Sequence, residues 1–170
     1  MQVSMQVHHL RSFIHAMPRY FKRILDAFSS PPFYTRYLSL PDPDEIPPEI
    51  YGNPKWFPYF KDVIGALDGT HIKCTPSERD REASRNRKGF LSQNCLMACS
   101  FDLRFLYVLS GSDGSTADAA VYHTARHMDF HIPVGKCYLA DGGFPLCDQL
   151  LVPYRRVRYH LNEWNRADQR

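Results

Sequence analysis

The sequence predicts an α/β domain built on a mixed sheet, in which three antiparallel strands precede a helix and a parallel fourth strand. Three observations carry this prediction. From residue 63 onward, short runs rich in β-branched and aromatic residues are separated by tight turns. One segment of helical periodicity follows the third run, and another apolar run follows that segment. A helix between two strands is the crossover that a parallel pair requires.

The first 60 residues differ from the rest in periodicity and proline content. Residues from about His8 to Phe28 carry an apolar stripe with helical spacing, interrupted by Pro18, which predicts two short helices or one kinked helix. The stripe consists of Leu10, Phe13, Ile14, Met17, Phe21, Ile24, Leu25 and Phe28. Most of the prolines follow, so we expect a connector with a helical turn near Glu45 to Tyr51. The predicted division is a helical segment over 1–30, a proline-rich connector over 31–60 and the main domain over 61–170.

Within the main domain, the local pattern predicts each element in turn. Strands are expected over Val63–Cys74, Asn94–Phe101 and Phe105–Gly111, with a tight hairpin at 102–104 between the last two. A helix is expected over Thr116–Met128 and a fourth strand over Lys136–Ala140. Residues 146–152 are expected to begin a helix or turn, and no fifth strand is predicted.

Two aspartates each end an apolar run and are followed directly by glycine. Asp68 precedes Gly69, and Asp141 precedes Gly142. Carboxylates at the ends of buried strands, with glycine leaving space beside them, are suitable ligands for a hard cation such as Mg²⁺. The alternative is that each Asp-Gly pair is only a turn, because this dipeptide is a strong turn former.

Asp118 is a third candidate ligand, at the start of the predicted helix. Its alternative role is structural, because Ser115 followed three residues later by an acid resembles a capping box. The order of strands, helix and acids is nevertheless the layout of the ribonuclease-H-like fold. In that fold the fourth strand lies beside the first, so Asp68 and Asp141 would meet and Asp118 would point toward them from the helix.

Length and composition fit one soluble domain. The chain has 170 residues, 44% of them hydrophobic, and no apolar run approaches the roughly 18 residues needed to span a bilayer. The N-terminus lacks a secretory layout, so we expect an intracellular protein. Five cysteines form no zinc-type spacing and are expected to be free thiols. They are Cys74, Cys95, Cys99, Cys137 and Cys147.

Basic residues cluster in two segments, although the net charge of +3 is too small to indicate a nucleic-acid partner. The clusters are Arg79, Arg81, Arg85, Arg87 and Lys88, and Arg155, Arg156, Arg158, Arg166 and Arg170. Each cluster is either a solvated charged segment or a contact surface for the DNA backbone. His71, three residues after Asp68, is either a phosphate contact or a structural histidine.

Five motifs, in order, resemble the nuclease domain of PIF/Harbinger-type transposases and their domesticated relatives, over about residues 55 to 165. They are Gly65-Ala66-Leu67-Asp68-Gly69-Thr70-His71-Ile72, Asn86-Arg87-Lys88-Gly89-Phe90-Leu91-Ser92-Gln93-Asn94, Gly114-Ser115-Thr116-Ala117-Asp118, Tyr138-Leu139-Ala140-Asp141-Gly142-Gly143-Phe144-Pro145 and Pro153-Tyr154-Arg155-Arg156-Val157-Arg158-Tyr159-His160. The sequence departs from the family pattern at Ser112-Asp113, where relatives usually carry a tryptophan. The segment over 1–30 resembles the end of the helix-turn-helix region that precedes the nuclease in this family.

The resemblance implies a DDE-superfamily endonuclease that cleaves DNA with a divalent cation, Mg²⁺ or Mn²⁺. It implies Asp68, Asp118 and Asp141 as catalytic metal ligands, with Asp68 bridging two cations. For DNA contact we expect Arg85, Arg87, Lys88, Arg155, Arg156 and Arg158. The family also implies nuclear localisation and a Myb-like DNA-binding partner protein.

The resemblance also implies that one catalytic residue is missing. The family's last glutamate lies on a helix farther downstream, so the domain is expected to be truncated after Arg170, and Glu163 is not expected to replace that glutamate. The alternative function is therefore a catalytically inactive, transposase-derived remnant that binds DNA or a protein partner.

Overall fold

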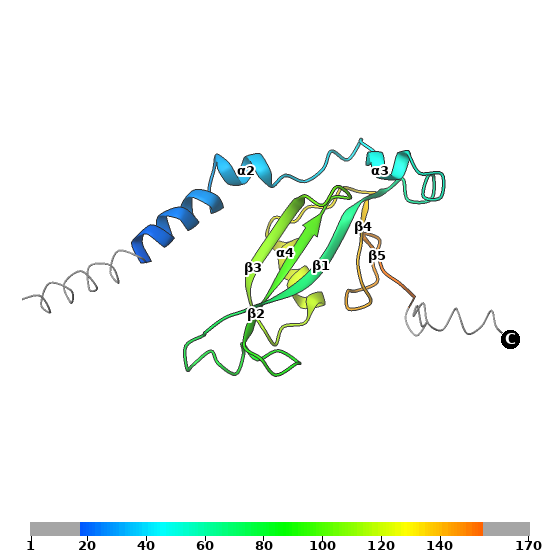
Figure 1. Cartoon of the computed structure of the whole chain (residues 1–170). Helices are drawn as coiled ribbons and strands as arrows, with labels where there is room; N and C mark the ends of the chain where they lie inside the picture. Colours follow the sequence, from blue (N-terminus) through cyan, green and yellow to red (C-terminus); the bar gives the residue numbers. More distant parts are fainter. Residues whose placement is uncertain (1–17, 155–170) are drawn as a thin grey trace, which may run out of the picture. The chain divides into compact units, whose positions relative to one another are not determined.

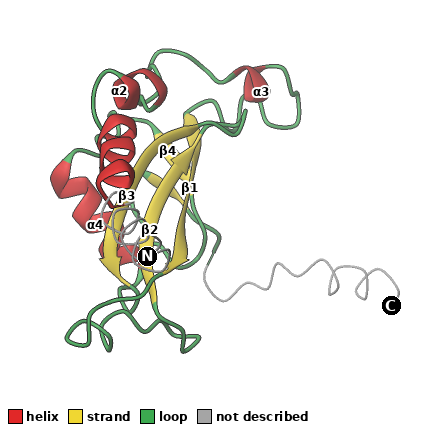
Figure 2. Cartoon of the chain, turned by 60° about the vertical axis from the view of Figure 1, so that its left-hand side comes forward, coloured by secondary structure: helices red, strands yellow, loops and turns green. Residues whose placement is uncertain are grey.

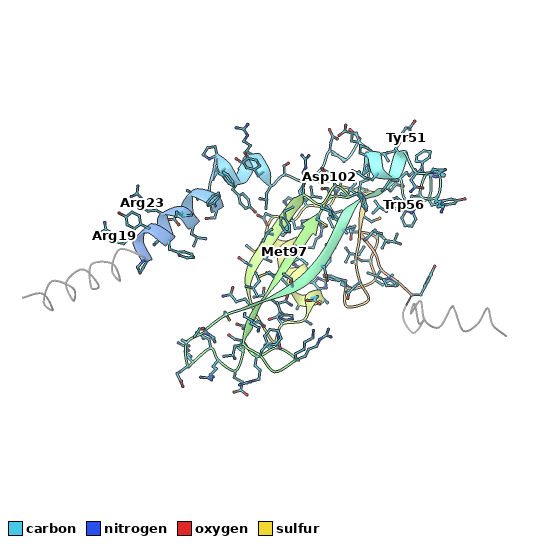
Figure 3. All side chains as sticks on the ribbon, in the orientation of Figure 1. Arg19, Arg23, Tyr51, Trp56, Met97 and Asp102 are labelled. Atoms are coloured by element: carbon cyan, nitrogen blue, oxygen red, sulfur yellow. The ribbon has the colours of Figure 1, made fainter. Side chains whose placement is uncertain are left out.

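The computed structural model describes residues 18–154, and the chain divides between Ser39 and Leu40 into two compact units. In the first unit, residues 18–29 are helical and α2 (Phe33–Tyr37) follows. The ring of Phe33 contacts those of Phe28 and Tyr37, with 4.6 Å between centroids in both pairs. Arg19 and Arg23 extend from the longer helix (Figure 3). Residues 8–17 of the predicted helix lie outside the described residues.

The proline-rich segment contains more helix than its composition predicts. The expected turn near 45–51 is confirmed as α3 (Pro48–Tyr51), but α2 was not expected. Proline fixes φ near the helical value, so it is compatible with a helix start even though it interrupts a helix interior. Pro32 at the N-cap of α2 and Pro48 at the first position of α3 both use this property.

The second unit is built on a five-stranded mixed sheet in the order β3-β2-β1-β4-β5 (Figure 1). Its strands are β1 (Val63–Lys73), β2 (Ser92–Cys99), β3 (Phe105–Asp113), β4 (Cys137–Leu139) and β5 (Leu150–Leu151). β1 pairs with β2, and β2 with β3, in antiparallel fashion, whereas β4 runs parallel to β1. The C-terminal end of β4, at Leu139, therefore lies beside Ala66 in the middle of β1, two residues before Asp68.

The prediction that no fifth strand follows residue 146 was wrong. Leu150 and Leu151 pair in parallel with Tyr138 and Leu139. A strand of two residues is too short to show alternation, so only the tertiary pairing with β4 identifies it.

One helix, α4 (Asp118–Met128), covers one face of the sheet (Figure 2). Its buried side chains, Val121, Tyr122 and Ala125, pack into the core. The core also contains Leu67, Leu96, Ala98, Phe130, Tyr138 and Phe144. The N-cap is Ala117, and no side chain caps the helix, so the capping-box alternative for Ser115 and Asp118 is not found. Asp118 instead occupies the first helical position, where a negative charge is favourable.

The hairpin at 102–104 is confirmed, with Leu103 in the left-handed region at φ 65°, and Asp102 lies at the same end of the sheet as Tyr51 and Trp56 (Figure 3). All five cysteines are free. Between residues 18 and 154, no helix has the length and hydrophobicity needed to cross a bilayer.

Candidate metal and nucleic-acid site

Asp68, Asp118 and Asp141 line a single cleft of about 550 Å³. Asp68 lies within β1, Asp118 begins α4, and Asp141 follows β4 by two residues. The parallel pairing of β1 with β4 brings the first and last acids together, and α4 supplies the middle one. The three acids that the sequence singles out therefore share one site.

Two glycines leave the space that the carboxylates occupy. A Cβ added at Gly69 would lie 2.0 Å from Asp118 Oδ1, a separation that atoms cannot adopt. A Cβ added at Gly143 would lie 3.0 Å from Asp141 Oδ1 and 3.5 Å from Asp118 Oδ2. Glycine is thus required beside Asp118 on the β1 side, and the carboxylates of Asp118 and Asp141 both lie next to Gly143.

The Asp68 carboxylate interacts with both other acids. Burial is the main cause that raises the pKa of Asp68 above its usual value, and the negative charges of Asp141 and Asp118 raise it further. The backbone N–H of Gly69 donates to Asp68 Oδ1 at 2.8 Å and partly offsets these effects. A cation between these carboxylates would relieve their mutual repulsion.

Asp118 is held by an asparagine to which the sequence analysis gave no role. Asn94 in β2 donates from Nδ2 to Asp118 Oδ1 at 2.8 Å and to the carbonyl of Thr116 at 2.9 Å. Its side chain is 1% exposed. The sequence signal that could have indicated this role is a polar residue directly before the apolar run from Cys95 to Ala98. Local pattern alone did not connect it to a helix 24 residues downstream.

Asp141 closes a turn as well as lining the cleft. The backbone N–H of Gly143 donates to Asp141 Oδ1 at 2.8 Å, which is the geometry of an Asx turn. The turn interpretation of this Asp-Gly pair is therefore correct. It is also compatible with metal binding, because a carboxylate has lone pairs beyond the one that accepts this hydrogen bond.

The donor set fits a hard cation that keeps part of its water shell. Among residues 18–154, no group of three or more His, Cys, Asp and Glu side chains could hold one ion alone. Mg²⁺ commonly binds through one or two carboxylates, several waters and substrate phosphates, so it needs no such group. The space left by Gly69 and Gly143 beside three all-oxygen ligands meets this requirement.

The cleft is also lined by two basic residues, Arg87 and Lys88, which we call the basic wall; they come from the loop between β1 and β2, which extends beyond the strand ends (Figure 1). Arg87 and Lys88 line the cleft, whereas Arg85 Nη1 donates to the carbonyl of Gly89 at 2.8 Å within the loop. The other three arginines predicted to contact DNA, Arg155, Arg156 and Arg158, lie outside the described residues.

Asn86 gives this loop its shape. Its Oδ1 accepts the backbone N–H groups of Lys88 at 3.0 Å and Phe90 at 3.3 Å, and its Nδ2 donates to Ser92 Oγ at 3.1 Å. The same Ser92 hydroxyl lies 3.1 Å from His71 Nδ1. His71 also lines the cleft and is half-buried, whereas its strand neighbours Thr70 and Ile72 are exposed. His71 therefore has a structural hydrogen bond and access to the site.

Comparison with known proteins assigns the family. The model of the DDE superfamily endonuclease domain matches residues 67–169. A putative nuclease of Rattus norvegicus, HARBI1, is 31% identical over 94 residues, which are 54% of this chain and 27% of the rat protein. The chain thus spans about a quarter of that relative's length. No solved structure matches the chain significantly. Because the family model covers more than half of the chain, this protein belongs to the DDE superfamily of endonucleases.

Proposed function

We propose that this chain carries the metal-binding part of a DNA endonuclease, with Asp68, Asp118 and Asp141 as the ligands. The observation that carries the proposal is the convergence of these three acids, from β1, α4 and the end of β4, on one cleft. The family is one of endonucleases that generally use divalent metals, and the similar rat protein is described as a putative nuclease.

The sheet supports this proposal because it is compatible with a ribonuclease-H-like fold. A strand order of 3-2-1-4-5, with β4 and β5 parallel to β1, places carboxylates from distant parts of the chain at one site. Such a fold supplies carboxylates, while the substrate phosphates supply further ligands.

In the proposed reaction a divalent cation supplies Lewis-acid chemistry and lowers the pKa of water. The residues of the chain hold and orient the reacting groups. Asp68 presents oxygens from β1, Asp141 from the turn that follows β4, and Asp118 from the start of α4. Arg87 and Lys88, which line the same cleft, neutralise the phosphate charge of DNA. A Myb-like partner and nuclear localisation remain predictions from the family resemblance.

The alternative proposal is a non-catalytic module that binds DNA through the basic wall. The observation that favours it is that, between residues 18 and 154, no three ligands surround a single ion position. The two proposals differ in whether the acids are needed for function. A nuclease requires Asp68, whereas a binding module requires only the basic wall.

Nicking of supercoiled plasmid DNA in the presence of Mg²⁺ or Mn²⁺ tests the proposal. We expect cleavage by the parent chain and its loss in the Asp68→Asn, Asp118→Asn and Asp141→Asn variants. Asp113→Asn is the matched control, because Asp113 ends β3 and does not line the cleft. Plasmid binding without cleavage, equal in the parent and all four variants, would instead support the binding module.

A further inference from the structure

The side chain of Asn94 is a buried amide whose hydrogen bonds link β2 to the start of α4. It lies in β2 directly opposite His71 of β1, and its side chain is 1% exposed. Both hydrogen bonds of its Nδ2 cross to the start of α4, at Thr116 and Asp118. A buried amide is costly unless its polar atoms are paired, so these two bonds explain how it is tolerated.

The orientation of this amide is fixed by its partners. The carbonyl oxygen of Thr116 can only accept a hydrogen bond, so Nδ2 must face it. A flipped amide would place Oδ1 against that carbonyl and the Asp118 carboxylate. The N–H donor toward Asp118 is therefore a permanent feature of the site.

Stability alone does not account for asparagine at this position. Asn94 Oδ1 is buried and has no hydrogen-bond partner among the described residues. An unpaired buried acceptor lowers stability, and such a group in a native protein calls for an explanation. The pairing of β2 with β3 also shifts register between Asn94 and Leu96, and irregularities of this kind often aim side chains at functional sites.

The two carboxylate oxygens of Asp118 have different neighbours. Oδ1 receives the Asn94 donor and lies on the Gly69 side, whereas Oδ2 lies on the Gly143 side, where Asp141 Oδ1 is also found. We infer that Asn94 is a positioning residue that holds Asp118 by Oδ1, so that Oδ2 is presented to a cation shared with Asp141. This inference rests on the proposed metal site.

The test replaces Asn94 by a side chain of similar size without donors, in Asn94→Leu. The matched control is Asn86→Leu, because Asn86 is also buried and beside the cleft but has hydrogen bonds only to Ser92 and its own loop. In the metal-free protein, three-bond couplings report the χ1 rotamer of Asp118. Calorimetry with Mn²⁺ then reports the dissociation constant.

We expect a single Asp118 rotamer in the parent and in Asn86→Leu, and averaged rotamers in Asn94→Leu. Mn²⁺ affinity should fall about 10–100-fold in Asn94→Leu only, as is usual when a residue that orients a metal ligand is lost. A folded Asn94→Leu protein with parent-like rotamer and affinity would overturn the inference. An equal loss in Asn86→Leu would also overturn it.

Two further measurements keep the outcomes separate. If Asn94→Leu does not fold, Asn94→Ala provides the same comparison, because its methyl side chain has no hydrogen-bond donor and adds no bulk. If the parent binds no Mn²⁺, the proposed metal site fails. The Asp118 rotamer in the metal-free protein then still decides whether Asn94 positions this carboxylate.

Discussion

Gly69 and Gly143 determine where the Asp118 carboxylate can lie. Both glycines leave room that any larger side chain would fill, and both adjoin carboxylates that come from other elements. From the sequence, the glycine after Asp68 was expected to leave space beside Asp68 itself, and in the structure Gly69 leaves space for the carboxylate of Asp118 as well. The requirement for glycine at 69 therefore arises from packing between β1 and α4.

Replacing Gly69 by alanine should move Asp118 without unfolding the domain. The new Cβ would lie 2.0 Å from Asp118 Oδ1, so the carboxylate must shift. We expect Mn²⁺ affinity to fall by about 10-fold or more, because ligand placement within a site must be accurate to roughly 0.5 Å. The control is Gly142→Ala, where an added Cβ meets nothing within 4 Å. Equal affinities for the two variants, measured by calorimetry, would contradict this account of Gly69.

Replacing Asp68 by asparagine should stabilise the domain at neutral pH. The raised pKa of Asp68 means that the folded state binds this proton more tightly than the unfolded chain. The free energy of unfolding therefore declines as pH rises from about 3.8 through the raised pKa, and it stays lower above that range. Asparagine removes this effect, so Tm at pH 7 should rise by roughly 1–3 °C, a small change for a partly exposed group.

Asp102 provides the matched control, because its pKa is shifted in the opposite direction to that of Asp68. A hydrogen bond from Ser100 and the nearby Arg104 guanidinium lower the pKa of Asp102, so its stabilising effect is present above about pH 3.8 and is lost as pH falls through the lowered pKa. Asp102→Asn should thus lower Tm slightly at pH 7. Thermal denaturation monitored by circular dichroism measures both variants. An Asp68→Asn protein that melts below the parent at pH 7 would show that burial and the neighbouring carboxylates do not raise the pKa of Asp68 as described.

At the scale of elements, the loop between β1 and β2 forms the basic wall because it is tied to the segment that leads into α4. The backbone N–H of Ser115 donates to the carbonyl of Ala83 at 3.0 Å, and Asn86 fixes the following turn. Arg87 and Lys88 therefore line the cleft, whereas Arg79 and Arg81 in the same loop do not. The fold of the loop thus places only some members of one basic cluster in the cleft.

This separation predicts different effects on DNA affinity. The double variant Arg87→Ala, Lys88→Ala should weaken DNA binding and reduce the slope of log affinity against log salt by about 2, because each phosphate contact contributes roughly 0.9. The double variant Arg79→Ala, Arg81→Ala has the same net charge and should leave the slope near that of the parent. Fluorescence anisotropy at several salt concentrations measures both. Equal slopes would show that the loop acts only through its overall charge.

Local pattern predicted most of the elements, including the short α3 and β4, but it did not predict α2 and β5. β1 to β4 and α4 lie within a few residues of their expected bounds, because alternation and helical spacing extend over enough residues to be recognised. α2 and β5 were missed, since five residues after prolines and two residues in a strand carry no periodic signal. Asp68 and Asp141 were identified from the apolar runs that they end and from their glycine neighbours, and Asp118 from its place at the start of a predicted helix. The role of Asn94 depends on a contact between β2 and α4, which local sequence does not encode.

At the scale of the whole molecule, the hydrophobic core and the cleft belong to the unit that begins at Leu40. Every core residue comes from this unit, and Leu40 itself packs against the core. The helical residues 18–29 carry exposed aromatic and aliphatic side chains, including Phe21, Ile24 and Phe28. The hydrophobic core of the unit that begins at Leu40 therefore does not depend on burial of that helix.

A chain that begins at Leu40 should consequently keep the fold and the metal site. We expect the same cooperative thermal transition as for the full chain, within about 3 °C, because no core contact is removed. Mn²⁺ affinity should also be unchanged. Loss of the transition or of metal binding would show that residues 1–39 are required for the unit that begins at Leu40.

We propose above that Asp68, Asp118 and Asp141 form one divalent-metal site. Calorimetric titration of the full chain with Mn²⁺, beside the double variant Asp68→Asn, Asp141→Asn, tests it most directly, with circular dichroism to confirm that both are folded. The account predicts saturable binding to the parent and its loss in the folded double variant. A folded parent that binds no Mn²⁺, or a double variant that binds as well as the parent, would contradict it.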